Sequence, residues 1–207
     1  MTEIRLKAVP AYEEGTLRLS GPRLTLRRPL AADAPAVAAL MNDFDVVKNL
    51  SRAPWPYRPA DAEGWLAAIA AVRGDRDAFP FAILADGAYA GTVGISTNPA
   101  NPGEIELGYW LGRPFWGKGY ATEAARLAVR FAFETLGLAV LAAGHFADNP
   151  ASGRVLQKLG FTYTEDVARF SKARDCDVAC KMMTLDRAHF ASRSEQGNEQ
   201  GGASHGG

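Results

Sequence analysis

Residues 108–122 read GYWLGRPFWGKGYAT, an aromatic stretch of strand character that passes through a glycine-rich turn into a long helical pattern. The start of a helix leaves several backbone N–H groups without intrahelical partners and carries about half a positive charge. Gly117 and Gly119 allow the backbone to approach a ligand closely and tolerate the positive φ angles that a cradle of N–H groups requires. The stretch therefore predicts an anion site that suits a phosphate group.

Two nucleotide-binding motifs match this stretch except at one position. Residues 112–118 fit G-x-x-x-x-G-K, but Gly119 stands where a P-loop has the Ser or Thr that holds magnesium. The dinucleotide fingerprint G-x-G-x-x-G/A would begin at Gly117, but Thr122 occupies its third small-residue position, and no acidic residue follows a second strand at the expected distance. Both an NTPase and a Rossmann-type protein are therefore disfavoured.

A third phosphate-binding pattern fits better. Residues 116–121, WGKGYA, resemble the acetyl-CoA pyrophosphate loop of the GNAT acetyltransferases, usually written Q/R-x-x-G-x-G/A, with Trp116 in the first position. The sequences NPAS at 149–152 and VLQKLGF at 155–161 resemble the second signature of that family, N-x-x-S before a short helix that ends in K-L-G-F. Together, at this separation in the sequence, the two signatures resemble the GNAT family specifically.

The resemblance continues upstream. RLTLR at 23–27 and AEGWL at 62–66 look like the opening of the branch that contains the ribosomal-protein N-terminal acetyltransferases, so the resemblance covers roughly residues 23–185. It implies an acetyl-CoA-dependent N-acetyltransferase, in which a primary amine of the acceptor attacks the thioester directly.

The resemblance also implies where acetyl-CoA binds. The family's sheet splays between two strands, here 104–111 and 140–146, and the cofactor inserts there. Backbone groups of 109–111 would then bind the pantetheine arm, as an edge strand binds an added strand. The implied cofactor-binding residues are Tyr109, Trp110, Leu111, Trp116, Gly117, Lys118, Gly119, Tyr120, Ala121, Thr122, Asn149 and Ser152.

The rest of the pattern predicts a mixed α/β fold, one sheet with helices on both faces. Asp86-Gly87 between two apolar runs is a strong hairpin signal, and the three prolines in 51–59 predict a loop. We expect strands at 24–28, 79–84, 89–96, 104–111, 140–146, 161 onward and 177–185, the last closing the sheet, and helices at 31–44, 59–72, 119–136 and 149–159.

A chain of 207 residues with 47% hydrophobic content can bury one full core. We therefore expect one acetyltransferase domain at 23–190, preceded by an arm at 1–22 of uncertain order. Residues 191–207 are mostly Ser, Glu, Gln, Asn and Gly with no apolar anchor, and predict a disordered tail.

The predicted reaction needs a neutral amine, a stabilised oxyanion and a proton for the leaving thiolate. Glu106, on the strand that leads into the loop, is our candidate general base, acting directly or through water. Glu104 shares its face of the strand and competes for this role, while Glu165 and Asp166 form a weaker second pair. The alternative for Glu106 is a solvated carboxylate.

The proton donor is less obvious. Many GNAT enzymes have a tyrosine in the helix before the G-F pair, but Leu156 occupies that position. Ser152 is the best replacement, because its hydroxyl could donate to the departing sulfur. Its alternative role is to cap the helix near Asn149.

Composition limits the partners. The 23 basic and 23 acidic residues give a net charge of zero, so no nucleic acid or anionic membrane is expected. No apolar run approaches the roughly 20 residues of a membrane helix, and we expect a cytoplasmic protein. Cys176 and Cys180 predict free thiols, and a metal site is not expected. The oligomeric state stays open.

The acidity of the acceptor amine narrows its identity. The pKa of an α-amine is about 2.5 units below that of lysine, so deprotonation at neutral pH costs about 3.4 kcal/mol less. A protein N-terminal α-amine is therefore favoured, with a small-molecule amine or an aminoglycoside as the alternative. A further alternative is a CoA-binding domain without catalysis. The loop at 55–57 is expected to shape the acceptor pocket.

Overall fold

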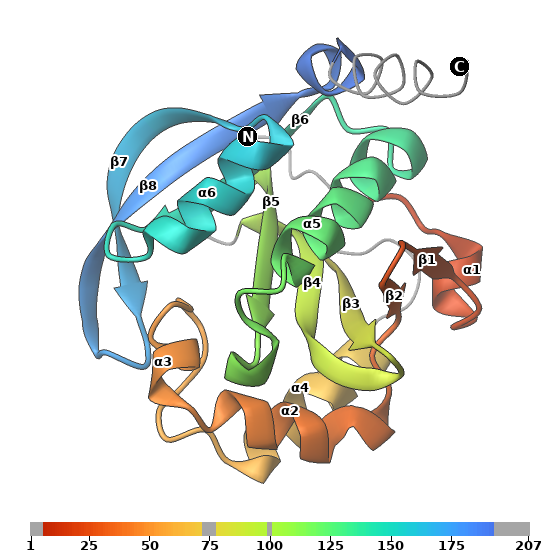
Figure 1. Cartoon of the computed structure of the whole chain (residues 1–207), viewed down its shortest axis with the longest axis vertical. Helices are drawn as coiled ribbons and strands as arrows, with labels where there is room; N and C mark the ends of the chain where they lie inside the picture. Colours follow the sequence, from red (N-terminus) through yellow and green to blue (C-terminus); the bar gives the residue numbers. More distant parts are fainter. Residues whose placement is uncertain (1–5, 72–77, 99–100, 193–207) are drawn as a thin grey trace, which may run out of the picture.

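The computed structural model of the chain describes residues 6–71, 78–98 and 101–192. In this part of the chain eight strands form a single sheet in the order β1-β2-β3-β4-β5-β6-β8-β7 (Figure 1). Neighbouring strands are antiparallel except β5 and β6, which are parallel. The strands are β1 (Arg18–Ser20), β2 (Leu24–Arg27), β3 (Ala78–Ala85), β4 (Ala88–Asn98), β5 (Asn101–Leu111), β6 (Val140–Phe146), β7 (Thr162–Ser171) and β8 (Cys176–Asp186).

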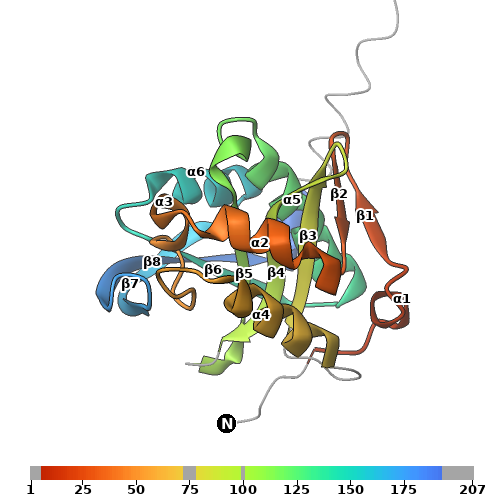
Figure 2. The same ribbon diagram turned by 90° about the horizontal axis from the view of Figure 1, so that it is seen from below.

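Helices cover both faces of this sheet, which confirms the predicted mixed α/β fold. Figure 2 shows α5 (Tyr120–Arg130) and α6 (Pro150–Leu159) on one face, and α2 (Ala34–Met41) and α4 (Pro59–Ala71) on the other. Two single-turn helices, α1 (Pro10–Glu13) and α3 (Phe44–Val47), add to them. No described helix is long and apolar enough to cross a bilayer.

Alternating side chains of β3 divide between two hydrophobic cores, because successive strand residues point to opposite faces. Phe79 and Phe81 pack edge-on against Phe131, the first residue after α5, with ring centroids 5.4 and 5.2 Å from its ring centroid. Ala82 points to the other face and packs in the cluster that contains Val37 of α2. The sheet is therefore buried on both sides, as the apolar run of β3 requires.

The N-terminal arm is part of the fold from residue 6 onward. Tyr12 of α1 is fully buried between Phe79 and Phe81, and its hydroxyl donates to the Pro80 carbonyl at 2.6 Å. β1 then pairs with β2 and extends the sheet by one strand. The sequence left this order uncertain because a one-turn helix and a three-residue strand carry too few residues to show a period.

Most of the expected elements are present, and some differ in extent or position. The hairpin at Asp86-Gly87 is confirmed, with φ of 49° and 78° at these two residues. The helix expected over 31–44 ends at Met41, because extended Asp43 starts α3 instead and accepts a hydrogen bond from the Asp45 amide. The strand expected to close the sheet, β8, lies inside it, and β7 is the edge. Most of the predicted tail lies outside the described residues.

The sheet splays in its middle. β5 and β6 pair only at Glu106 with Ala142 and at Leu107 with Ala143, although both strands continue beyond these pairs. β6 stays paired with β8 along its whole length, and β5 with β4. The sheet therefore opens between residues 108–111 and 144–146, as predicted.

Candidate active site

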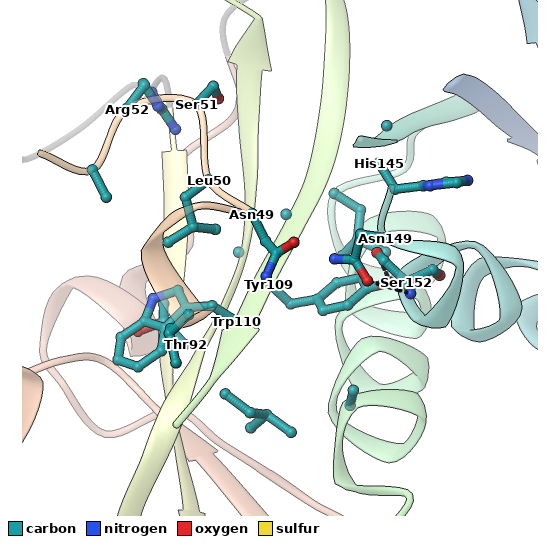
Figure 3. A pocket seen from close by; sticks show the side chains of 18 of the residues that line it. Asn49, Leu50, Ser51, Arg52, Thr92, Tyr109, Trp110, His145, Asn149 and Ser152 are labelled. Carbon is teal, nitrogen blue, oxygen red and sulfur yellow. Dashed lines mark hydrogen bonds between the residues drawn. The ribbon is translucent and has the colours of Figure 1, made fainter. Parts of the chain in front are cut away.

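A cavity of about 1430 Å³ lies at this splay. Its walls include residues of β4, β5, β6, α2, α4, α5, α6, the loop after α3 and the connection between β7 and β8. In Figure 3, residues 49–52 and Trp110 lie on one side, His145, Asn149 and Ser152 lie on the other, and Tyr109 points toward Asn149 and Ser152. We call this space the central cavity.

The loop before α5 forms one end of the central cavity. Gly117 and Gly119 have φ of 74° and 77°, a left-handed conformation that side chains with a Cβ rarely adopt. The first hydrogen bond within α5 runs from the Glu123 amide to the Gly119 carbonyl at 3.2 Å. The preceding amides, at 120–122, therefore have no helical carbonyl to bind and are available to an anion.

The side chains of this loop do not all face the cavity. Trp116, Gly117, Gly119, Ala121 and Thr122 line it, with Tyr109, Trp110, Leu111, Asn149 and Ser152 of the other predicted sites. The ammonium of Lys118 lies instead over the Phe115 ring at 5.8 Å, and the Tyr120 ring lies beneath the Arg23 guanidinium at 5.0 Å. Lys118 and Tyr120 therefore contribute their backbone atoms to the loop.

A brace that the sequence did not reveal holds the loop in place. The buried carboxylate of Glu123 accepts hydrogen bonds from the Arg23 amide at 2.9 Å, from Arg23 Nε at 2.8 Å and from the Leu24 amide at 3.1 Å. Arg23 Nη1 donates in turn to the Lys118 carbonyl at 2.8 Å. On the other side, Trp116 Nε1 donates to the Leu111 carbonyl at 2.7 Å. Both ends of the loop are thus fixed to strands.

Tyr109 and Ser152 meet in the cavity (Figure 3). The Tyr109 hydroxyl lies 2.8 Å from Ser152 Oγ and 3.1 Å from the Ser152 carbonyl oxygen. Burial raises the pKa of Tyr109 to about 12, partly opposed by the hydrogen bond with Ser152. Asn149 caps α6 by accepting from the Ser152 amide at 3.3 Å, which leaves the Ser152 hydroxyl to Tyr109. Leu156 is buried and offers no proton donor.

Glu106 lines the cavity as part of a charged cluster. Both of its oxygens accept from Arg169 of β7, at 2.6 and 3.1 Å, and Asn98 Nδ2 donates to Glu106 at 3.1 Å and to Glu104 at 2.8 Å. Burial, and then the neighbouring Glu106, raise the pKa of Glu104. The other carboxylates considered, Glu165 and Asp166, are exposed on β7 and do not line the cavity.

At the opposite end of the cavity, the connection between β7 and β8 forms hydrogen bonds with the loop after α3. The Lys172 amide donates to the Ser51 carbonyl at 2.9 Å, and Arg174 Nε donates to the Lys48 carbonyl at 2.8 Å. Arg174 also forms an ion pair with Asp148, at 2.7 Å, beyond the end of β6. We call this arrangement the clasp.

Known proteins share this architecture. The N-acetyltransferase p20 of Bacillus licheniformis, whose function is uncharacterised, is 27% identical over 82% of this chain and 96% of its own length. RimL, described as a ribosomal L7/L12 alpha-N-protein acetyltransferase in complex with coenzyme A, superposes with a TM-score of 0.66 and 17% identity, covering 82% of this chain and 98% of RimL. The microcin C7 self-immunity acetyltransferase MccE, in complex with acetyl-CoA and AMP, gives 0.67 at 20% identity, covering 80% and 93%. Likeness at these identities shows the shared fold.

A family model assigns the chain more firmly. The model described as "Acetyltransferase (GNAT) domain" matches residues 23–162, more than half of the chain. The match includes both predicted signatures, the loop at 116–121 and the NPAS sequence at 149–152. The chain therefore belongs to the GNAT family and is an N-acetyltransferase.

Proposed function

We propose that this enzyme transfers the acetyl group of acetyl-CoA to a primary amine, with the α-amine of a protein N-terminus as the favoured acceptor. One observation carries the proposal: a single cavity joins a backbone anion cradle at 117–122 to the point where β5 and β6 separate. An activated acyl group on a phosphorylated carrier fits both features. The complexes of RimL with coenzyme A and of MccE with acetyl-CoA support this donor.

The cradle suits the pyrophosphate and the open edge of β5 suits the pantetheine arm. β5 pairs with β6 only at Glu106 and Leu107. Beyond these residues the two strands are not paired, so the backbone groups of 109–111 on this edge of β5 are open to the cavity. Such groups bind the amides of an extended ligand as they would bind another strand. Lys118 contributes its backbone to the cradle, since its side chain packs on Phe115.

The Tyr109–Ser152 pair provides the proton donor that the Leu156 position lacks. If the phenol donates to Ser152 Oγ, the hydroxyl proton of Ser152 is free to form a hydrogen bond with the departing thiolate. The amine nitrogen forms its bond to the carbonyl carbon while the C–S bond breaks, and the sulfur gains the negative charge that this hydrogen bond stabilises. Ser152 is the catalytic group here, and Tyr109 orients it.

Glu106 is our proposed proton acceptor for the amine, working through water. Arg169 donates to both of its oxygens, so a water molecule would carry the proton from the amine to Glu106. An α-amine, whose ordinary pKa is about 8, loses its proton more readily than lysine, whose pKa is about 10.4. This argument favours a protein N-terminus, and the name of RimL describes such an acceptor for that protein.

An acceptor screen tests the proposal. Purified enzyme with acetyl-CoA is offered peptides with free N-termini, the same peptides with blocked N-termini and one lysine, small amines and an aminoglycoside. Free thiol release is followed and the products are identified by mass spectrometry. We expect thiol release with the free N-termini and little with the blocked ones. Binding of acetyl-CoA without thiol release from any amine would indicate a non-catalytic CoA-binding domain, and turnover confined to small amines would assign the acceptor to that class.

A further inference from the structure

The acceptor end of the central cavity carries two cations that lack partners. Arg52, next to the loop segment held by the clasp, and Lys172, in the clasp itself, both line the cavity. Within the described part of the chain, neither side chain forms a hydrogen bond or an ion pair. Starting from the proposed N-acetyltransferase function, we propose that the acceptor carries an anionic group near its amine, bound by Arg52 and Lys172.

Three of the other carboxylates around this end are in ion pairs, and Asp61 is the exception. Asp45 pairs with Lys48 at 2.6 Å, Glu106 with Arg169 at 2.6 Å, and Asp148 with Arg174 at 2.7 Å. Asp61, a further carboxylate in the lining, accepts from the Arg58 amide at 2.8 Å. The excess of positive charge is confined to this end of the cavity, because the chain as a whole has 23 basic and 23 acidic residues. A cleft lined by unpaired charge of one sign attracts ligands of the opposite sign.

The fold holds the backbones that carry the two cations next to each other. The Lys172 amide donates to the carbonyl of Ser51, the residue before Arg52, at 2.9 Å. Ser171 Oγ donates to the Leu50 carbonyl at 3.4 Å, and Figure 3 shows Arg52 on this loop, across β5 from Ser152. Two like charges fixed on adjacent backbones repel each other, and an anion between them relieves that repulsion.

The position along β7 indicates where the acceptor's charge lies. Arg169 of β7, which holds Glu106, precedes Lys172 by three residues, and Lys172 is the first residue after β7 ends at Ser171. At a rise of about 3.3 Å per strand residue, the two backbone positions lie at most roughly 10 Å apart. An extended peptide whose amine lies near Glu106 covers that distance in about three residues. The matching acceptor is a peptide with an Asp or Glu at about its third position.

Matched peptides test this acceptor class. The amidated peptides Ser-Ala-Asp-Ala-Ala-Ala, Ser-Ala-Asn-Ala-Ala-Ala and Ser-Ala-Lys-Ala-Ala-Ala differ only at the third residue. We expect kcat/KM for the Asp peptide to exceed that for the Asn peptide about five- to tenfold at low salt, to lose this advantage as salt rises, and to exceed that for the Lys peptide by more. Aminomethylphosphonate compared with methylamine asks the same question of small anionic amines.

Variants assign the preference to the two cations. The double change Arg52→Gln with Lys172→Gln should bring the Asp-to-Asn ratio to about one, and Lys172→Glu should reverse the preference toward the Lys peptide. Arg126→Gln, on the exposed face of α5 and outside the cavity, is the matched control and should keep the wild-type ratio. Equal kcat/KM for the Asp and Asn peptides in the wild-type enzyme, or a ratio that survives the double change, would overturn the inference.

A binding measurement separates this inference from the proposed function. Calorimetry of the same peptides with the CoA-loaded enzyme compares their affinities without any turnover. If no peptide is acetylated but the Asp peptide still binds more tightly, the proposed N-terminal acceptor is wrong and the anionic site stands. If all three peptides are acetylated and bound equally well, the proposed function stands and the anionic site is wrong.

Discussion

Gly119 determines both the backbone conformation of the loop at 116–121 and the access of a ligand to it. Its φ of 77° lies in the left-handed region, and the Arg23 Nη2 atom is 3.4 Å from the position that a Cβ would take. A β-branched residue there is strained by about 1–2 kcal/mol and narrows the cradle. The same backbone conformation at Gly117 makes the whole turn depend on glycine.

We therefore expect Gly119→Val to weaken acetyl-CoA binding at least about tenfold, as measured by calorimetry. Gly64→Ala is the matched control: Gly64 lies within helix α4, where an added Cβ meets nothing within 4 Å, so affinity should not change. The melting temperature of each variant reports whether the fold survives. Unchanged acetyl-CoA affinity in a folded Gly119→Val protein would rule out the loop as the phosphate site.

The Tyr109–Ser152 pair gives a second prediction at the scale of single residues. Tyr109→Phe and Ser152→Ala should each lower kcat about ten- to a hundredfold with little change in acetyl-CoA affinity. Because both changes interrupt one hydrogen bond of 2.8 Å, the double variant should be no slower than the slower single variant. Additive losses would show that the two residues act separately.

The pH profile tests the buried environment of Tyr109. Burial raises the pKa of Tyr109 to about 12, so its phenol stays protonated where an ordinary tyrosine ionises, near pH 10. The wild-type kcat should accordingly show no loss from Tyr109 between pH 9 and about pH 10.5. An alkaline decline near pH 10 that disappears in Tyr109→Phe would contradict this environment.

At the scale of elements, Glu123 connects β2 to the first turn of α5. Its carboxylate accepts two backbone amides, from Arg23 and Leu24, so its loss leaves donors of the strand without partners. The same residue positions Arg23, whose guanidinium holds the Lys118 carbonyl in the loop. A defect in this brace should therefore affect both folding and cofactor binding.

Glu123→Gln should lower the free energy of unfolding by about 1–3 kcal/mol, because an amide group replaces one accepting oxygen opposite several donors. The acetyl-CoA affinity should fall with it. Glu134→Gln is the control: Glu134 forms an exposed pair with Arg130 at 3.4 Å, so its loss should cost under about 1 kcal/mol. Urea denaturation and calorimetry compare the two variants, and an equal effect of both would show that the brace contributes nothing specific.

Elements also show what a sequence can predict. The glycine loop could be predicted because its φ angles depend on residues that are neighbours in the sequence. The hairpin at Asp86-Gly87 could be predicted for the same reason. The pairs that complete the site join distant positions: Tyr109 and Ser152 are 43 residues apart, Glu106 and Arg169 are 63, and Arg23 and Glu123 are 100. Only the folded sheet brings such residues together, so local patterns could name Glu106 and Ser152 but not their partners.

At the scale of the whole molecule, the splay divides the enzyme into two halves with different tasks. The sequence signatures lie on the side of α5 and α6, where the proposed donor binds. The opposite wall combines the loop after α3 with the connection between β7 and β8, segments more than a hundred residues apart in the chain. The proposed donor and acceptor sites therefore come from separate parts of the chain and should respond to mutation separately.

The clasp allows a direct test of that separation. Arg174 ties three segments together: it donates to the Lys48 carbonyl, pairs with Asp148 and lies over the Phe146 ring at 5.2 Å. Arg174→Met keeps the side chain's bulk but removes these polar contacts, so the acceptor wall should loosen. We expect KM for the acceptor to rise about three- to tenfold while the acetyl-CoA affinity stays within twofold of the wild type.

Arg187→Met is the matched control, because Arg187 also donates to a backbone carbonyl, that of Leu138, but lies outside the cavity lining. If Arg174→Met weakened acetyl-CoA binding as much as acceptor binding, the two halves would have to be treated as one coupled site.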